Sequence, residues 1–318
     1  MLDGDTSQAI DDIAETLRHA QEPEVMLEAH TFRQDLHIKT GQCDLVRQYA
    51  EQSMAQTAQL PASPALARIA RYHAAQTAYN WSWCGERLNL PISQTYSEAL
   101  QAPALAEDFS RHEPPGAPDH RASTSRAMAQ SGWMAAQLGL LGEAMGYYRT
   151  AVFDLIAAVQ AAPLASANVI ALTETMEEWA IVSQRFIDPD QAAPALDEMM
   201  TAAQPVLAAH TLPAGGRFSL AFSAMITGAN LYQNDQSAKA GQYLHTAYQL
   251  TRELLKLETP PPRTPSTHCT VIRHQSIVDA ENGNLRQALG RAAQARDCVA
   301  RLNEALPDKD YQPVLADI

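Results

Sequence analysis

The sequence predicts an all-α protein, an α-solenoid of about six antiparallel helix pairs, and three observations support this. One plan recurs along the chain: a proline-marked break, a long Ala-rich segment, a short turn around Gly, Asn or Asp, and a second Ala-rich segment. The turns are roughly 45 to 50 residues apart, a spacing typical of repeat arrays. Alanine is the best helix former, and segments rich in Val, Ile and Thr with strand-like alternation are missing.

Six breaks and six turns define the expected repeats. The breaks fall at Pro23, Pro64, Pro118, Pro163, Pro213 and Pro265. The turns fall near Gly41, Asn89, Gly139, Asp188, Asp235 and Gly283. We therefore expect a single repeat domain over 1–318, with an N-terminal helix at 6–21 and repeats at approximately 23–61, 64–105, 119–162, 164–211, 214–258 and 266–306.

The third repeat shows most clearly how its two helices are expected to pack. Gly139 ends the first helix, because glycine accepts the left-handed conformation that follows a helix C-terminus. The second helix then places Ala144, Tyr148 and Ala151 on one stripe. Small residues here and at Gly132 in the first helix allow two antiparallel helices to approach closely. Tyr148 is expected to fill the space between them.

This stretch resembles the tetratricopeptide repeat (TPR) family. The segment QLGLLGEAMGYYRTAV carries the second half of the family pattern: a glycine at the turn, Leu141 two residues later, then the small, aromatic and small residues described above. The fifth repeat follows it with Gly228, Asp235, Ala240, Leu244 and Ala247. The sixth follows it with Gly283, Leu285, Ala288, Ala292 and Ala295, and the first more loosely with Gly41, Cys43, Val46, Ala50 and Ser53.

The second and fourth repeats keep only the helix–turn–helix plan. The period of about 48 residues is longer than the TPR unit, so the resemblance is to a TPR-like array. It implies a right-handed superhelix in which the first helix of each repeat lines a concave groove.

Residues on the groove wall are the candidate binding residues that this resemblance implies. They are Gln76, Tyr79, Trp83, Arg126, Trp133, Glu178, Arg185, Tyr232 and Arg273. Binding hot spots favour aromatic residues and arginine. The aromatic members are expected to anchor a partner, while the arginines pair with acidic or terminal carboxylate groups. The alternative for Trp83, Trp133 and Trp179 is that they fill the core between neighbouring repeats.

The charge and the cysteine content indicate which classes of partner and which cell compartment to expect. The formal charge is −13, from 23 basic and 36 acidic residues, and no basic cluster is present. This argues against nucleic acid and against an anionic membrane surface. No apolar stretch is long enough to span a bilayer, and the N-terminus lacks a signal pattern. The cysteines, Cys43, Cys84, Cys269 and Cys298, lack CxxC spacing and are interpreted as buried thiols of a cytoplasmic protein.

One acidic motif is similar to the magnesium–diphosphate motif of all-α terpene cyclases. Asp11, Asp12 and Glu15 form DDxxE on one expected helix face. A magnesium site would need a second acidic cluster opposite the first, and the one candidate, 234–237, lacks the rest of that pattern. Acidic residues also favour the first turn of a helix, where they meet its positive dipole end. This second interpretation is preferred.

The sequence gives little support for a zinc site or for nucleophilic catalysis. His30 and His37 share a helix face, and His268, Cys269 and His274 lie close together in the sequence. Neither group contains a short zinc motif, so these histidines are expected at helix surfaces or interfaces. No nucleophile elbow or phosphate-binding loop is present.

The sequence therefore predicts a non-catalytic, cofactor-free scaffold or adaptor that binds a protein or peptide in the concave groove. The acidic balance also allows a basic partner on the outer face, and a homodimer stays open. Two alternatives remain: a sensory or regulatory module that binds a signalling peptide or a small molecule, and an all-α metal-dependent enzyme similar to terpene cyclases.

Overall fold

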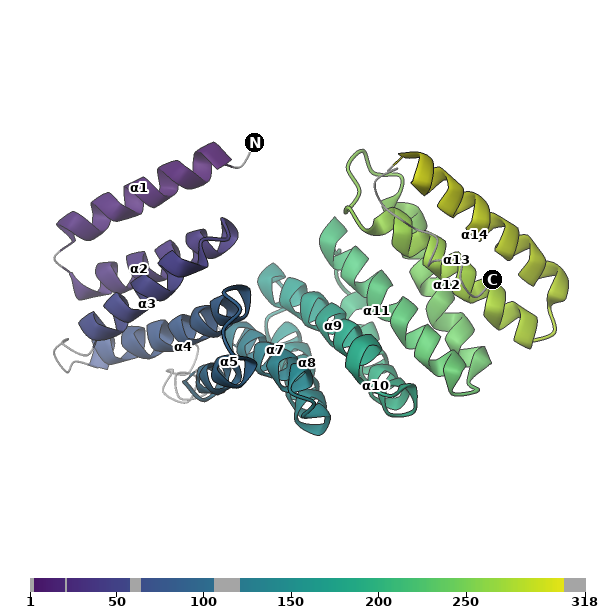
Figure 1. The fold of residues 1–318 in the computed structure, drawn as a ribbon, viewed down its shortest axis with the longest axis horizontal. Coiled ribbons are helices and arrows are strands. Elements are labelled where there is room, and N and C mark those ends of the chain that lie inside the picture. The colour runs from purple at the N-terminus through teal and green to yellow at the C-terminus, as the bar shows by residue number, and fades with distance from the viewer. Residues whose placement is uncertain (1–2, 21, 58–63, 106–120, 306–318) are drawn as a thin grey trace. The chain divides into compact units, whose positions relative to one another are not determined.

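The computed structural model describes residues 3–20, 22–57, 64–105 and 121–305 (Figure 1). All regular structure in this part of the chain is helical, which confirms the all-α prediction. The chain forms two compact units, an N-terminal unit of Met1–Ala151 and a C-terminal unit of Val152–Ile318. No helix in the described residues is long and apolar enough to cross a membrane.

Helices follow one another in antiparallel pairs. In the N-terminal unit they are α1 (Asp3–His19), α2 (Pro23–Lys39), α3 (Cys43–Thr57), α4 (Pro64–Arg87), α5 (Ile92–Ala99), α7 (Arg121–Gln137) and the first half of α8 (Leu141–Ala161). In the C-terminal unit they are the second half of α8, then α9 (Ser166–Phe186), α10 (Pro189–Ala208), α11 (Ala214–Gln233), α12 (Ser237–Leu254), α13 (Thr264–Glu281) and α14 (Leu285–Ala305). We call α2, α4, α7, α9, α11 and α13 first helices, and their partners α3, α5, α8, α10, α12 and α14 second helices. The described residues therefore contain six pairs, in agreement with the predicted fold class.

Backbone conformation explains why the turns could be located in the sequence. Five of the six predicted turns contain a residue with positive φ: Gly41 (73°), Asn89 (55°), Gly139 (76°), Asp235 (58°) and Gly283 (78°). Glycine, asparagine and aspartate tolerate this left-handed region better than other residues. The sixth turn differs, because Asp188 has a negative φ of −59° and Pro189 begins α10. The Asp188 carboxylate accepts a hydrogen bond of 2.9 Å from the backbone N–H of Asp190 and so caps the helix.

Two glycines confirm the predicted close approach of paired helices. A Cβ added at Gly132 on α7 would lie 2.9 Å from the ring of Tyr148 on α8. A Cβ at Gly228 on α11 would lie 2.8 Å from Leu244 and 3.1 Å from the carbonyl oxygen of Ala240, both on α12. Real Cβ atoms do not tolerate such distances, so the first helix needs glycine where the second helix places a bulky side chain. This close approach agrees with the small residues expected at these positions of the repeat.

The core of the N-terminal unit contains a buried histidine held by two hydroxyl groups. His73 on α4 is 1% exposed, and its Nδ1 lies 2.5 Å from Oγ1 of Thr31 on α2. Thr31 donates its own proton to the carbonyl oxygen of Leu27, so Nδ1 of His73 must be the donor to Thr31. Nε2 then accepts from the hydroxyl of Ser53 on α3. Burial, followed by the charge of nearby His30, lowers the pKa of His73 to about 4.

Amides continue this polar core between α2 and α4. Gln34 donates to Thr77 over 3.3 Å, and Asn80 donates to Gln34 over 3.4 Å and to Asp35 over 3.2 Å. His30 and His37, which the sequence placed at helix surfaces or interfaces, are 4% and 3% exposed and belong to the interior.

The C-terminal unit has a core of a different kind. Its largest fully buried side chains are almost all apolar, and α11 between its neighbours is buried along most of its length. They include Trp179, Leu172, Met176, Leu196, Met199, Ile226, Leu231 and Leu244. Trp179 is 1% exposed, so the core-filling alternative holds for this tryptophan.

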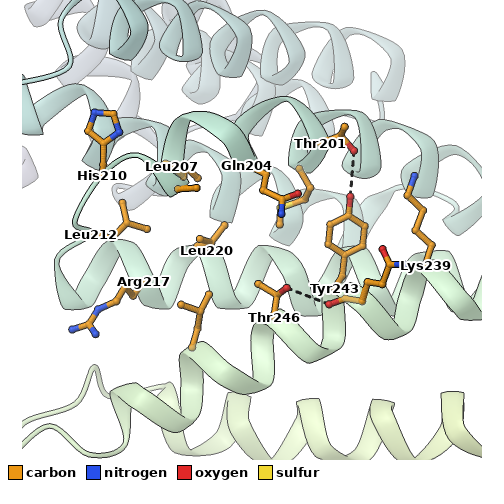
Figure 2. A pocket seen from close by; sticks show the side chains of 14 residues that line it. Thr201, Gln204, Leu207, His210, Leu212, Arg217, Leu220, Lys239, Tyr243 and Thr246 are labelled. Atoms are coloured by element: carbon orange, nitrogen blue, oxygen red, sulfur yellow. Dashed lines mark hydrogen bonds between the residues drawn. The ribbon is translucent and has the colours of Figure 1, made fainter.

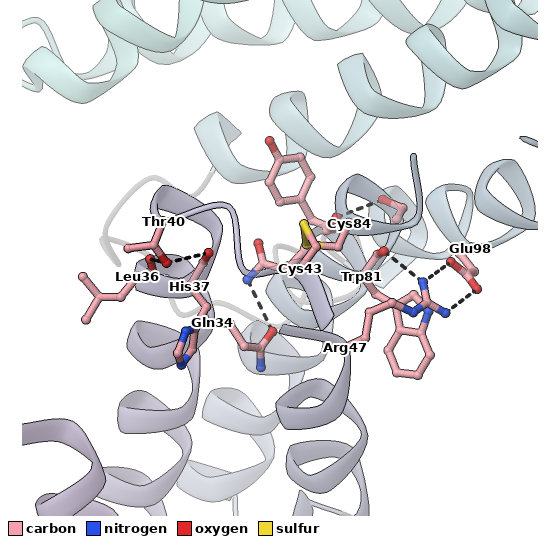
Figure 3. Close-up of a disulfide and its surroundings, with 12 residues drawn as sticks. Gln34, Leu36, His37, Thr40, Cys43, Arg47, Trp81, Cys84 and Glu98 are labelled. Carbon is pink, nitrogen blue, oxygen red and sulfur yellow. Dashed lines mark hydrogen bonds and ion pairs between the residues drawn. A yellow bond between two sulfur atoms is a disulfide. The ribbon is translucent and has the colours of Figure 1, made fainter. Parts of the chain in front are cut away.

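The prediction of four separate thiols was wrong. Cys43 at the start of α3 is bonded to Cys84 near the end of α4, with the Cα atoms 5.1 Å apart (Figure 3). Cys269 on α13 is bonded to Cys298 on α14, with the Cα atoms 5.6 Å apart. Both separations suit a disulfide, and they arise because helix packing joins residues 41 and 29 positions apart. Since disulfides persist in oxidising compartments, the cytoplasmic location loses its cysteine argument and stays a prediction.

An ion pair near the first disulfide joins three helices (Figure 3). Arg47 on α3 donates to both carboxylate oxygens of Glu98 on α5, over 3.0 and 3.1 Å, and its guanidinium carbon lies 4.4 Å from the ring centroid of Trp81 on α4. Burial alone would raise the pKa of Glu98, but the hydrogen bonds from Arg47 hold it below its usual value. The two-point contact fixes α5 against α3 and α4.

Candidate functional site

The predicted groove residues of the N-terminal unit lie on α4 and α7. On α4, Gln76, Tyr79 and Trp83 are half-buried and follow one stripe at helical spacing. On α7, Arg126 is exposed and Trp133 is half-buried, seven residues further along the same face. Because α4 and α7 contact each other, the two stripes belong to neighbouring first helices.

Two predicted tryptophans meet charged side chains where α4 and α7 end. The indole Nε1 of Trp133 donates to the carboxylate of Glu86 over 2.8 Å, and Gln137 donates to the same oxygen over 3.0 Å. One residue beyond Glu86, the guanidinium carbon of Arg87 lies 3.7 Å from the ring centroid of Trp83. We call Trp83, Glu86, Arg87, Trp133 and Gln137 the tryptophan patch.

Trp83 also has a structural role. Its ring packs against the buried cluster of Cys43, Val46 and Cys84. The core interpretation therefore holds for part of this side chain, and its role in a groove stays a prediction. Gln76, by contrast, donates along its own helix to Asn80 over 3.2 Å.

In the C-terminal unit, the predicted residues are spread over three first helices. Glu178 and Arg185 lie on the exposed stripe of α9, and Arg273 is half-buried on α13. Tyr232 is half-buried near the end of α11, where burial and then a hydrogen bond with Glu281 of α13 raise its pKa. The common role of these four residues in a groove stays a prediction.

Sequence reasoning missed a charged cluster on the first helices of this unit. Arg263, just before α13, lies 3.0 Å from a carboxylate oxygen of Glu177 on α9, and Ser219 on α11 donates to the other oxygen over 2.7 Å. The Arg263 guanidinium carbon also lies 4.7 Å from the ring centroid of Phe222, which is 6% exposed. The segment before α13 thus covers part of α11. No short-range pattern could reveal a pair 86 residues apart.

A pocket between the second helices α10 and α12 and the first helix α11 was also missed. It has a volume of about 450 Å³ and is lined by residues of α10, α11, α12 and the α10–α11 connection (Figure 2). At one end Lys239 pairs with Asp197, and the hydroxyl of Tyr243 donates to the same carboxylate over 2.8 Å. Burial, together with this hydrogen bond to Asp197, raises the pKa of Tyr243 to about 12.

The described residues contain no group of side chains placed to bind a metal ion. Asp11 and Asp12 are exposed on α1, and Glu15 pairs with Arg18 and His19 on the same helix over 2.7 and 2.8 Å. Across the part of the chain described, no three His, Cys, Asp or Glu side chains converge as metal ligands would. Cys269, part of the second candidate zinc group, is in a disulfide.

Comparisons with known proteins bear on the fold alone. No protein-family model matches the sequence, and no curated protein is significantly similar to it. Among solved structures, BtubC from P. vanneervenii is similar with a TM-score of 0.52 and 14% identity, over 82% of this chain and 93% of that one. The apo quorum sensor NprR from B. thuringiensis gives a TM-score of 0.48 and 12% identity, over 95% and 79%. The apo form of RapI gives a TM-score of 0.46 and 9% identity, over 87% and 77%. At these identities the likeness concerns the arrangement of helices and leaves the ligand open.

Proposed function

We propose that this chain is a non-catalytic recognition module that binds an extended segment or a helix of another protein along the first helices α4 and α7 of its N-terminal unit. The observation that carries the proposal is the tryptophan patch. Two half-buried tryptophans from neighbouring helices lie beside charged groups on one surface. Tryptophan and arginine dominate protein-binding hot spots because a rigid ring buries a large area at little entropic cost.

Arg126 extends this surface along α7. It lies seven residues before Trp133, a rise of about 10 Å along a helix. A bound segment that places an apolar side chain on the tryptophan patch would therefore present its next residues to an exposed guanidinium. Such a group suits a carboxylate of the partner.

Panning of the immobilised full chain against a random-peptide library tests this proposal. We expect enriched peptides with an apolar or aromatic residue near an acidic one. The Arg126→Glu variant, and the double variant with Trp133→Ala, should weaken their binding at least tenfold. The surface variant Arg126→Glu remains informative if removal of Trp133 destabilises the fold.

The matched control is on the second helix of the same pair. Tyr147→Ala with Arg149→Glu changes an aromatic residue and an arginine on α8. It should leave peptide binding within twofold of the unmodified chain. Absence of any enriched peptide, or an equal loss in both double variants, would contradict the proposal.

A further inference from the structure

The pocket between α10, α11 and α12 has features of a small-molecule site that are unrelated to the tryptophan patch (Figure 2). Its volume of about 450 Å³ lies within the range of ligand pockets in proteins, about 300–1,000 Å³. Such sites combine a mostly apolar wall with a few polar groups that fix the orientation of the ligand. All of the lining residues belong to the C-terminal unit.

Leucines from each of the contributing elements form the apolar wall. They are Leu207 of α10, Leu212 of the connection, Leu220 of α11 and Leu250 of α12. Leu207 is 3% exposed, whereas the other three are only half-buried. Half-buried leucines that converge on a concavity leave apolar surface in contact with water. An apolar group that replaced this water would be favoured by the hydrophobic effect.

Polar groups at the two ends of the pocket differ in how they are satisfied. At the Lys239 end, the ammonium, the Tyr243 hydroxyl and the Asp197 carboxylate satisfy one another. At the other end, the ring nitrogens of His210 lie 2.7 and 3.0 Å from the carbonyl oxygens of Val206 and Pro163, and the nitrogen that carries the proton donates to the oxygen it faces. A further polar ligand group gains little from either set.

Arg217, which lies at the His210 end, is the exception (Figure 2). The side chain is half-buried, and its Nε is buried without a hydrogen-bond partner in the described part of the chain. None of the ion pairs found among the described residues includes Arg217. A guanidinium that is partly removed from water and has no acidic partner favours an anion, and a carboxylate matches its two-pronged geometry.

We propose that this pocket binds a small aliphatic carboxylate. Its carboxylate pairs with Arg217, and its hydrocarbon body lies along Leu212, Leu220 and Leu250. The uncompensated arginine sets the charge of the ligand, and the leucine wall sets its apolar character. The site lies between α10, α11 and α12 and does not depend on polypeptide binding at the tryptophan patch.

Isothermal titration of the full chain with octanoate, octanol, octylamine and acetate tests both parts of the proposal. Octanoate should bind at least tenfold more tightly than octanol, which lacks the charge, and than acetate, which lacks the body. Octylamine should not bind. Equal affinity for octanoate and octanol would overturn the role of Arg217, and equal affinity for octanoate and acetate would overturn the role of the leucines.

Two variants locate the site. Arg217→Gln should weaken octanoate binding at least tenfold, whereas Arg286→Gln, which changes an exposed arginine on α14, should leave it unchanged. Circular dichroism melting confirms that both variants fold. Unchanged binding in Arg217→Gln would overturn the proposal, as would tighter binding of the peptide acetyl-Gly-Gly-Leu, whose carboxylate represents the C-terminus of a protein partner.

Discussion

The N-terminal and C-terminal units use the same paired-helix packing around cores of different chemistry. In the N-terminal unit, buried His73 and Asn80 are held by hydroxyl, amide and carboxylate groups from α2 and α3. In the C-terminal unit, α9 and α11 bury mainly apolar side chains such as Trp179 and Leu231. An apolar core depends on shape, whereas a polar core also depends on every donor finding an acceptor and on protonation state. The two units should therefore respond differently to the same change of conditions.

The largest expected effect comes from the disulfides, one in each unit. A cross-link that closes a loop of this length restricts the unfolded chain and stabilises the fold by about 3 to 4 kcal/mol. We expect Cys43→Ala with Cys84→Ala to destabilise the N-terminal unit, and Cys269→Ala with Cys298→Ala to destabilise the C-terminal unit. Denaturant unfolding gives the size of each loss, and peptide-resolved hydrogen exchange shows which helices lose protection. A loss of protection in the unit that keeps its disulfide would contradict this separation.

A fall in pH should lower the stability of the N-terminal unit through its buried His73. The folded pKa of His73, about 4, lies below the 6.5 of an unfolded histidine, so the unfolded chain takes up the proton first. This contribution to stability is complete above pH 6.5 and is lost as the pH falls toward 4, to a total of about 3 kcal/mol. Burial also lowers the pKa of His37 in the same unit and of His268 in the C-terminal unit.

Tryptophan fluorescence of a Trp179→Phe protein reports on the N-terminal unit, which holds the other three tryptophans. Its guanidinium unfolding between pH 7.5 and 4.5 should shift more steeply than that of the same protein with His73→Gln. Equal pH slopes for the two proteins would show that His73 does not titrate as its surroundings indicate.

A smaller effect is expected where the helices approach most closely. Gly228→Ala and Gly132→Ala would each overpack a helix pair and cost about 1 to 3 kcal/mol. The loss should be larger at Gly228, because its new methyl group would lie 3.1 Å from a backbone oxygen, closer than the 3.3 Å at Gly132. Thermal melting compares these with Gly146→Ala and Gly290→Ala, which have no neighbour within 4 Å and should gain up to about 1 kcal/mol from helix propensity. Destabilisation of all four variants alike would refute the close-approach argument.

Local rules explain what the sequence could predict. The turns at Gly41 and Gly139 were found because only certain residues accept positive φ. The stripe that joins Arg126 to Trp133 follows from the helical period alone. Gly132 and Tyr148 were matched because their spacing from the turn fixes which residues face each other.

The remaining features depend on contacts between distant segments. No local sequence pattern indicates that the Cα atoms of Cys43 and Cys84 lie 5.1 Å apart. His30 and His37 have the spacing of a helix face but do not reveal whether that face is covered. The pocket around Arg217 needs three helices to be in place before its leucines converge.

The disulfide between Cys43 and Cys84 joins a second helix to the first helix of the next pair. In a repeat array, where each pair contacts only its neighbours, the end pairs ordinarily fray one at a time. Here the pair α2–α3 cannot separate from α4 alone, because α3 is covalently bonded to α4. Mechanical tension applied through the chain ends would pass along the sulfur–sulfur bond, and the 41-residue stretch that it spans would stay slack until the bond is reduced.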